Sequence, residues 1–156
     1  MYSVDKLKIW NIAQLLQVSN ILYRCGKDMA AKYDLHHWDN SYVKSLLIVM
    51  ICALKNDIYL IRNDGKAVAT FQNKMVGDAL LLSKLAILPA FAKHGIGSYC
   101  LQKNEEIGRE KHCTKVVCDV YNKSEAAICF YEHRGYTAVG TAKTRKYGIL
   151  KMCKAL

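Results

Sequence analysis

The sequence predicts an α/β (α+β) fold in which helices flank a mixed, mostly antiparallel central sheet. Three observations predict it: two helical patterns near the N-terminus, a hairpin signal at Asn63-Asp64-Gly65, and a strand that passes through a basic turn into a helix between residues 80 and 101. The 156 residues are the size of one domain and contain enough apolar side chains to bury a core without metal or disulfides. We therefore expect a single domain over residues 1–156.

The two helical patterns occupy the first third of the chain. The first runs from about Leu7 to Tyr33, with a break expected at Gly26. Its buried face is expected to contain Ile12, Leu15, Leu16, Ser19 and Leu22. The second is expected over residues 40–55. Its apolar run, Leu46 to Leu54, is about half the roughly 20 residues that span a bilayer, so we interpret it as a core helix.

The strands follow in a set order. Residues 57–62 and 66–72 flank the hairpin signal, and a third strand begins near Ala79. After these come a helix, a strand, a short helix, and two closing strands at about 137–145 and 147–154. A strand before the first helix is left open, because Ser3 to Lys8 is short.

The turn after the third strand has features of an anion site. The apolar strand reaches the only proline, Pro89, and the chain then crosses Lys93, His94, Gly95, Ile96, Gly97 and Ser98 into a helix marked by Ile96, Cys100 and Ile107. The free backbone N–H groups and positive dipole end of a helix start bind phosphates. The glycines alone fit a tight turn equally well. There is no third glycine for a dinucleotide fingerprint and no Gly-Lys-Ser/Thr for a P-loop.

A second motif lies about 35 residues further on. A strand at Val116–Tyr121 leads to a short helix that ends in Phe130-Tyr131-Glu132-His133-Arg134-Gly135-Tyr136. Together with the glycine loop, this resembles the GNAT superfamily of acetyl-CoA-dependent N-acetyltransferases over roughly residues 57–140. The resemblance implies the fold above. It also implies an acyltransferase that moves an acetyl group from acetyl-CoA to a primary amine of a small molecule or peptide, by direct attack in a ternary complex.

The resemblance also implies site residues. The pantetheine arm of coenzyme A would lie along Leu85, Ala86 and Ile87, with a backbone N–H near Ile87 as oxyanion donor. The pyrophosphate would lie over the amides of Lys93, His94, Gly95, Ile96, Gly97 and Ser98. Tyr131 matches the general acid that protonates the departing thiolate, since a tyrosine of ordinary pKa, about 10, is protonated at neutral pH. Phe130, which lacks a hydroxyl, is the expected core residue.

Three positions depart from the family pattern. Ala92 stands where arginine or glutamine is usual, and Ser124 stands where asparagine is expected. Asn122 is close enough to substitute, although helix capping explains Asn122 or Ser124 as well. No acid lies in the strand from Leu80 to Leu88, where many relatives have a glutamate base. The candidates for the base are therefore Asp78, Asp119, His36 and His37, and an acceptor of low amine pKa would need none.

Ala92 and the missing strand acid leave a second function open, and the charge of the chain bears on its partner. The formal net charge of +10 favours acidic partners, which include coenzyme A. A non-catalytic GNAT-like module that binds coenzyme A or an acidic partner is the alternative. The basic stretch from Thr141 to Lys154 is interpreted as a solvated edge strand or as a patch for an acidic acceptor. Nucleic acid is not favoured, because Tyr147 is the only aromatic residue interleaved with those basic residues.

The remaining expectations concern location and partners. Seven cysteines without a C-x-x-C pair, and an N-terminus without a signal peptide, predict reduced thiols in the cytoplasm. The segment Asp34 to Asp39, which holds Trp38, is either a wall of the acceptor pocket, as in the family, or a packing plug between helices. Its two histidines without a carboxylate partner do not predict a metal site. A homodimer is plausible for such a fold, with no interface located.

Overall fold

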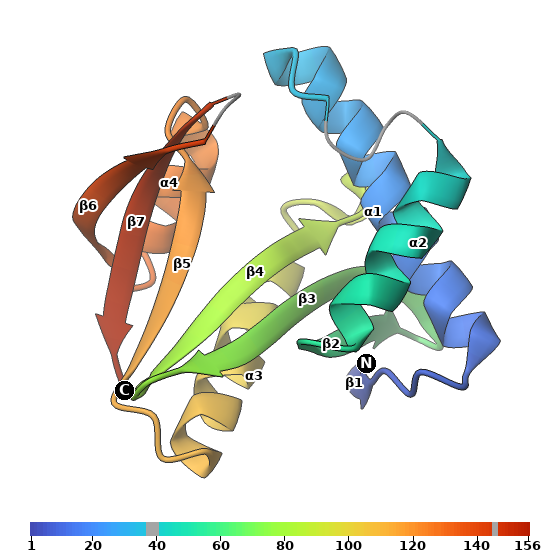
Figure 1. The fold of residues 1–156 in the computed structure, drawn as a ribbon, viewed down its shortest axis with the longest axis horizontal. Helices are drawn as coiled ribbons and strands as arrows, with labels where there is room; N and C mark the ends of the chain where they lie inside the picture. The colour runs from blue at the N-terminus through green and yellow to red at the C-terminus, as the bar shows by residue number, and fades with distance from the viewer. Residues whose placement is uncertain (37–40, 145–146) are drawn as a thin grey trace. The chain divides into compact units, whose positions relative to one another are not determined.

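The computed structural model describes residues 1–36, 41–144 and 147–156 (Figure 1). In this part of the chain the elements are β1 (Tyr2–Lys6), α1 (Ile12–Tyr33), α2 (Tyr42–Ala53), β2 (Asp57–Asn63), β3 (Lys66–Val76), β4 (Ala79–Ile87), η1 (Pro89–Phe91), α3 (Ile96–Glu110), β5 (Lys115–Tyr121), α4 (Glu125–Glu132), β6 (Thr137–Lys143) and β7 (Gly148–Ala155). The strands form one sheet in the order β1-β2-β3-β4-β5-β7-β6. Strands β4 and β5 are parallel, whereas the β1–β2, β2–β3, β5–β7 and β6–β7 pairs are antiparallel. The predicted fold class is confirmed.

The chain forms two compact units. Unit 1 contains Met1–Asn73 and Lys84–Cys100, and unit 2 contains Lys74–Ser83 and Leu101–Leu156. The chain passes from one unit to the other within β3, β4 and α3. Each unit is described by itself below.

The core of unit 1 lies under its two helices, α1 and α2, which lie side by side (Figure 1). Its buried members come from α1, α2, β2, the end of β4 and the residue after it, and are Leu15, Val18, Ile21, Leu22, Cys25, Val49, Ile58, Leu60, Ala86 and Leu88. Helix α1 runs unbroken through Gly26, which is buried, so the predicted break is wrong. Two residues predicted in its buried face, Ile12 and Leu16, are exposed. Leu15 lies near one edge of the buried face of the helix, and Ile12 and Leu16 lie beyond that edge.

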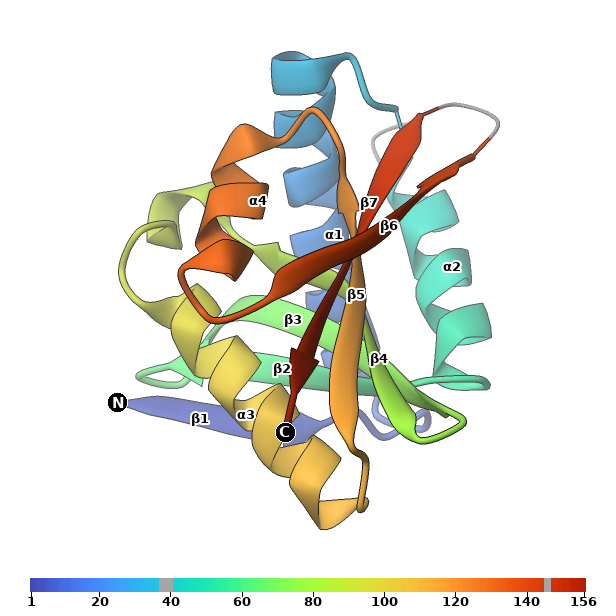
Figure 2. The same ribbon diagram turned by 90° about the vertical axis from the view of Figure 1, so that its left-hand side faces the viewer.

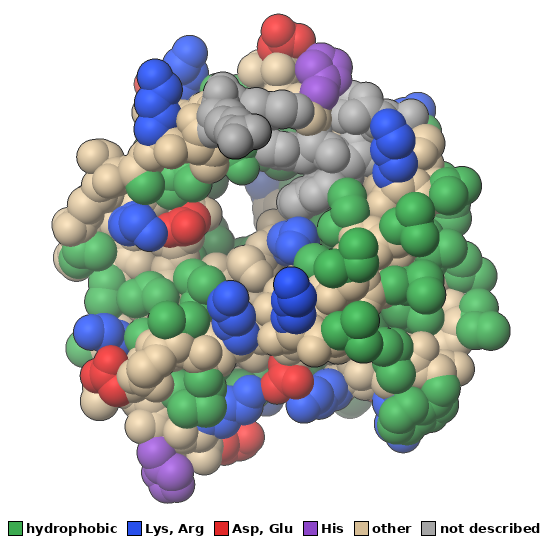
Figure 3. Space-filling model, viewed as in Figure 1, with side chains coloured by type: hydrophobic (Ala, Val, Ile, Leu, Met, Phe, Trp, Pro, Cys, Tyr) green, Lys and Arg blue, Asp and Glu red, His purple; other side chains and the backbone are tan. Residues whose placement is uncertain are grey.

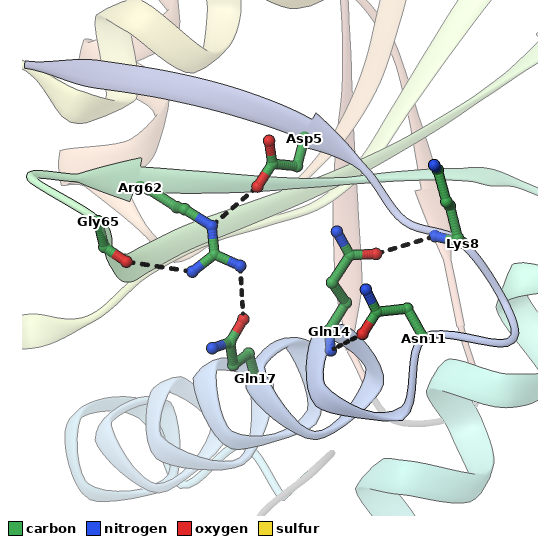
Figure 4. A network of polar contacts seen from close by, with 7 residues as sticks. All are labelled: Asp5, Lys8, Asn11, Gln14, Gln17, Arg62 and Gly65. Atoms are coloured by element: carbon green, nitrogen blue, oxygen red, sulfur yellow. Dashed lines mark hydrogen bonds and ion pairs between the residues drawn. The ribbon is translucent and has the colours of Figure 1, made fainter.

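Polar contacts determine where α1 begins. Asn11 is the N-cap and its Oδ1 accepts from Gln14 N at 3.1 Å, while Gln14 Oε1 accepts from Lys8 N at 3.0 Å (Figure 4). The helix therefore starts at Ile12, five residues later than the apolar pattern predicts.

The strands of unit 1 are tied to α1 by Arg62. Its guanidinium donates to Asp5 Oδ2 at 2.8 Å, to Gly65 O at 3.2 Å and to Gln17 Oε1 at 2.8 Å (Figure 4). The predicted hairpin is confirmed, with Asp64 and Gly65 at φ 48° and 79° forming the two-residue turn. Strand β1, left open by the sequence, is present and pairs with β2.

Helix α2 is a surface helix rather than the core helix that its apolar run predicts. Only Ser45 and Val49 in it are buried, whereas Val43, Leu47 and Leu54 at its C-cap are more than half exposed. Because α2 is apolar around most of its circumference, its sequence does not show which side packs on the sheet.

Unit 2 contains the two closing strands, which the sequence predicts to within a few residues. Strands β5, β7 and β6 lie side by side, in a register that runs from Lys115↔Ala155 to Tyr121↔Ile149 between β5 and β7 (Figure 2). Strand β6 is the sheet edge and is largely exposed, but only Thr141 to Lys143 of the basic stretch lie on it, so the edge-strand interpretation holds for Lys143 and not for the residues of β7, which is an inner strand. Lys151 and Lys154 of β7 bond Asp119 and Glu105 instead. Arg145 lies outside the described residues.

The seven cysteines differ in how far they are buried. All seven cysteines are free, and burial raises the pKa of Cys25, Cys100 and Cys118 to about 12, so these three are unreactive thiols at neutral pH. Cys129, in contrast, is exposed. None of the described helices combines the length and apolar character that crossing a bilayer requires.

Candidate active site

The glycine loop, residues 93–98, lies in unit 1 where the predicted strand, turn and helix are all present. Strand β4 ends at Ile87, η1 follows, and α3 begins at Ile96. Lys93 and Gly95 have φ 64° and 79°, the left-handed region that glycine adopts without strain. Gly95 O accepts the first bond of α3, from Tyr99 N at 3.1 Å, so Gly95 is the N-cap of the helix.

The amides of this loop are the candidate phosphate donors. In the described part of the chain, the N–H groups of Gly95, Ile96 and Gly97 donate to no backbone carbonyl. Lys93 and His94 are exposed beside them. Unused N–H groups at the positive end of a 15-residue helix, next to a lysine, fit an anionic group such as a pyrophosphate.

A contact from the N-terminal strand holds the loop, and the sequence did not reveal it. Tyr2 OH of β1 donates to His94 O at 2.8 Å, and the rings of Tyr2 and Tyr99 lie 5.3 Å apart. Because Tyr2 is 92 residues from His94 and lies on a strand left open by the sequence, no local pattern could have indicated this pairing.

A substitution at Gly95 tests the loop. Gly95→Ala is expected to reduce the affinity for coenzyme A about tenfold, because a left-handed alanine costs about 1–2 kcal/mol and relaxation would turn the amides away. A Cβ there would meet nothing within 4 Å, so the effect comes from backbone strain and not from a clash. Isothermal titration calorimetry measures it, with Gly140→Ala as the control, since Gly140 has an equally open Cβ position and no left-handed φ. Unchanged affinity in Gly95→Ala would remove this loop as the phosphate site.

The end of β4 supplies the predicted strand segment Leu85–Ile87. Ala86 is buried in the core of unit 1, so Leu85 and Ile87, which are half-buried, point to the other face of the strand. Ile87 O accepts from Cys25 Sγ at 3.1 Å, and the next residue, Leu88, donates its N–H to Val68 O at 2.9 Å. These two bonds fix the end of the segment to α1 and β3.

Lys84, directly before this segment, has a backbone conformation that sequence reasoning missed. It has φ 48°, which interrupts the extended backbone of β4 immediately before Leu85. Its Nζ donates to Cys52 Sγ of α2 at 3.1 Å. The register that β4 shares with β5 runs from Ala79 to Leu82, so the irregularity comes just after the regular ladder. A lysine within an apolar run carries no signal for a left-handed backbone.

Tyr131 lies in unit 2 on α4 and is buried. Its ring makes edge contacts with Phe130 and Tyr136, each with centroids 5.4 Å apart. Phe130 is only half-buried, so the expectation that Phe130 is the core residue of the pair is wrong. The α4 C-terminus contributes to this, because Tyr136 N and Arg134 N both donate to Tyr131 O and fold the chain back over it.

Asn122 and Ser124 precede α4 in different roles. Ser124 is the buried N-cap residue of α4, yet its side chain makes no capping bond. Asn122 N donates to Gly148 O at 3.2 Å, and its side-chain amide lies where a Cβ on Gly148 would be. The Asn122 side chain therefore packs on the start of β7 and does not cap α4.

The candidate bases each have a partner. Asp78, in the β3–β4 turn of unit 2, accepts from Thr114 Oγ1 at 2.6 Å and lies 3.9 Å from Lys115 Nζ. The Thr114 hydrogen bond, and then the Lys115 charge, lower the pKa of Asp78 below its usual value, which makes it a weaker base. Asp119 accepts from Lys151, and His36 lies 3.1 Å from Asp34. His37 lies outside the described residues.

We expect Asp78→Asn to leave kcat within about twofold of the wild type, because its exposed, ion-paired carboxylate is poorly suited to accept a proton. A steady-state assay at pH 7 to 9 measures this. Glu106→Gln is the matched control, since Glu106 is likewise an acid of unit 2 paired with a lysine, its pKa is also lowered, and it is not a candidate base. A loss of tenfold or more in Asp78→Asn alone would restore Asp78 as the base.

The predicted residues therefore form two groups. Unit 1 brings together Leu85, Ala86 and Ile87 with the glycine loop, and unit 2 holds Tyr131, Asn122, Ser124 and Asp78. Of the predicted acceptor segment, Asp34 to His36 are described, and His37, Trp38 and Asp39 lie outside the described residues. Among the described residues, no cluster of three or more His, Cys, Asp or Glu side chains could hold a metal ion.

Comparison with known proteins identifies a family whose model matches this chain. The model of the acetyltransferase (GNAT) family matches residues 15–136. Among similar solved structures is the PaiA N-acetyltransferase from Thermoplasma acidophilum in complex with coenzyme A, with a TM-score of 0.77 and 18% identity, covering 100% of this chain and 99% of that one. The ribosomal-protein-S18-alanine N-acetyltransferase from Escherichia coli has a TM-score of 0.74 and 16% identity, covering 99% and 94%. An acetyltransferase from Streptococcus agalactiae has a TM-score of 0.77 and 17% identity, covering 99% and 98%.

Proposed function

The chain belongs to the GNAT family of acetyltransferases, and on that premise we propose that it transfers an acetyl group from acetyl-CoA to a primary amine of a small molecule or peptide. The transfer is by direct attack in a ternary complex. The observation that carries the proposal is the glycine loop, whose unused amides and left-handed backbone suit the pyrophosphate of coenzyme A. A cytoplasmic enzyme is part of the proposal, since seven free thiols are typical of a reducing compartment.

The residues of unit 1 bind and orient the cofactor in this proposal. The amides of Gly95, Ile96 and Gly97 bind the pyrophosphate, and Lys93 adds a positive charge. Backbone groups of Leu85, Ala86 and Ile87 hold the pantetheine arm, with an N–H near Ile87 as donor to the developing oxyanion. Acetyl-CoA, when bound, supplies an activated thioester carbonyl.

The reaction needs a proton donor for the leaving thiolate, and in this proposal the donor is Tyr131 of unit 2. A bond forms from the amine nitrogen to the acetyl carbon and the C–S bond breaks. The nitrogen loses a proton to solvent as the amide forms, and the thiolate gains one from a donor that solvent then reprotonates. Tyr131 donates it in the proposal, while Asn122 and Ser124 support the cofactor. We assign no base role to Asp78, because its pKa is lowered, and the amine reaches the site as the neutral form present in solution.

A thermal-shift titration tests the cofactor first. Acetyl-CoA and free coenzyme A at a hundred times their dissociation constants should each add about 2.7 kcal/mol of stability, and NAD should add none. Thiol release on adding a panel of amines and N-terminal peptides then tests turnover. No stabilisation by either form would overturn acetyl-CoA as the substrate. Stabilisation without turnover on any amine would favour the non-catalytic module.

A further inference from the structure

Helix α2 presents an apolar face to solvent. Its large apolar side chains Val43, Leu47, Met50 and Ile51, with Leu54 at the C-cap, are all at least two fifths exposed. Four of them, at positions 43, 47, 50 and 54, are spaced by four, three and four residues, which is the spacing of a helix-packing seam. Their exposure shows that the described residues of unit 1 do not cover them, although another side of α2 packs into the core of unit 1 through Val49.

The start of α1 extends this face. Four exposed apolar residues are added, Ile12 and Leu16 on α1 and Ile9 and Trp10 in the turn before it. The two helices meet here, because Tyr42 OH of α2 donates to Leu16 O of α1 at 2.9 Å. Figure 3 shows hydrophobic side chains gathered over α2 and the beginning of α1, on its right-hand side. We name these nine residues the apolar face.

The apolar face is large enough for a stable contact. A fully exposed residue of this size presents roughly 200 Å². Nine residues that are 40% to 78% exposed therefore present on the order of 1,000 Å². This exceeds the roughly 300–600 Å² of the largest apolar patch on a typical monomer, and it matches the roughly 800 Å² that each partner contributes to a standard interface.

We propose that the apolar face binds a second copy of this chain, with the two α2 helices packed antiparallel about a two-fold axis. The spacing four-three-four reads the same in both directions, so an inverted copy presents a matching seam. Its midpoint lies between Leu47 and Met50, which brings Leu47 against Met50 of the second copy and Val43 against Leu54. This inference is independent of the proposed acetyl transfer.

The effect of salt on binding distinguishes a second copy from a lipid surface. Helix α2 contains no acidic residue, and the exposed Lys44 and Lys55 flank the seam at its two ends. In an antiparallel pair Lys44 of one copy lies near Lys55 of the other, so added salt should strengthen self-association by screening them. Binding of the same lysines to anionic lipid would weaken with salt.

Analytical ultracentrifugation over a concentration series, at 50 and 500 mM NaCl, measures the dimer dissociation constant. The wild type should dimerise, and more tightly at the higher salt. Leu47→Lys should weaken the dimer about 100-fold, because a twofold interface contains the change twice and one lost buried leucine costs about tenfold. Leu54→Lys provides a second variant at a position 74% exposed, where a lysine does not disturb folding.

Val139→Lys is the matched control. Val139 is 63% exposed on β6 of unit 2, outside the apolar face, and its dimer constant should equal that of the wild type. Circular dichroism checks that each variant is folded. A wild type that stays monomeric at all concentrations, or a dimer unaffected by both α2 variants, overturns the proposal. So does a monomer that co-sediments with vesicles of phosphatidylcholine and phosphatidylserine and releases them at 500 mM NaCl, since that assigns the face to lipid.

Discussion

Tyr131→Phe is expected to lower kcat by about 100-fold or more, while the dissociation constant for acetyl-CoA changes less than about twofold. General acid catalysis contributes roughly 10²–10⁴-fold, and phenylalanine removes the donor but keeps the ring. The edge contacts of the ring with Phe130 and Tyr136 should persist, so α4 keeps its packing. Stopped-flow or steady-state thiol release measures kcat, and calorimetry measures affinity.

Tyr23→Phe is the control for this substitution. Tyr23 lies on α1 in unit 1, where its ring packs edge-on against Tyr42 at 6.0 Å, and it has no role in the proposed chemistry. Both variants should melt within a few degrees of the wild type. Equal kcat values for Tyr131→Phe and the wild type would remove Tyr131 from the mechanism. A parallel loss of affinity and kcat would make it a cofactor-binding residue instead.

Glu105→Ala should destabilise the protein by about 3 kcal/mol, the largest stability effect we expect from a single polar side chain. Glu105 is a buried acid on α3 in unit 2. Lys154 Nζ donates to its two oxygens at 2.8 and 2.9 Å, and Tyr136 OH donates to Oε1 at 3.3 Å. Removing the carboxylate leaves a half-buried ammonium and a buried hydroxyl without their acceptor.

Guanidinium unfolding measures the loss as a lower midpoint at unchanged slope. Glu106→Ala, one residue along the same helix, is the matched control. Glu106 pairs with Lys103 at the surface, so its removal should cost less than about 0.5 kcal/mol. The double variant Glu105→Ala/Lys154→Met should recover part of the loss, since the unpaired charge is gone. Similar losses for Glu105→Ala and Glu106→Ala would contradict a stabilising role for this network.

Tyr136 connects this network to the proposed acid. Burial, and then the Glu105 charge, raise the pKa of Tyr136, so its hydroxyl stays protonated and remains a donor to Glu105. Its ring packs on Tyr131 on the other side. Glu105→Ala should therefore also lower kcat, through the position of Tyr131, at temperatures where the variant is fully folded.

The order of elements could be predicted because each carries a local signal. Asp64 and Gly65 supply the left-handed pair of a hairpin turn, and the change from a strand run to helical spacing around Gly95 marks the start of α3. For the candidate site the same holds in part. The sequence placed Gly95 at the helix start and Tyr131 near the end of α4, because both positions follow from spacing alone.

The buried side of a helix could not be predicted where its residues are apolar on all sides. Helix α2 is apolar on nearly all sides, so its sequence did not show that Val49 is buried and Leu47 exposed. Adjacent aromatics raise the same difficulty: Phe130 and Tyr131 differ by about 100° around the helix, and the choice between them depends on where Tyr136 packs. Contacts between distant segments, such as Tyr2 with His94, leave no pattern in the sequence.

The left-handed backbone at Lys84 restricts which residues evolution can place there. Valine, isoleucine and threonine, the residues that strands otherwise favour, are strained at φ 48°, whereas glycine, asparagine and aspartate tolerate it. A library randomised at this position and selected only for soluble expression would thus be depleted of β-branched residues, although its neighbours on both sides are typical strand residues. The residue preferences at position 84 would then resemble those of a loop, although the residues on both sides of it form a strand.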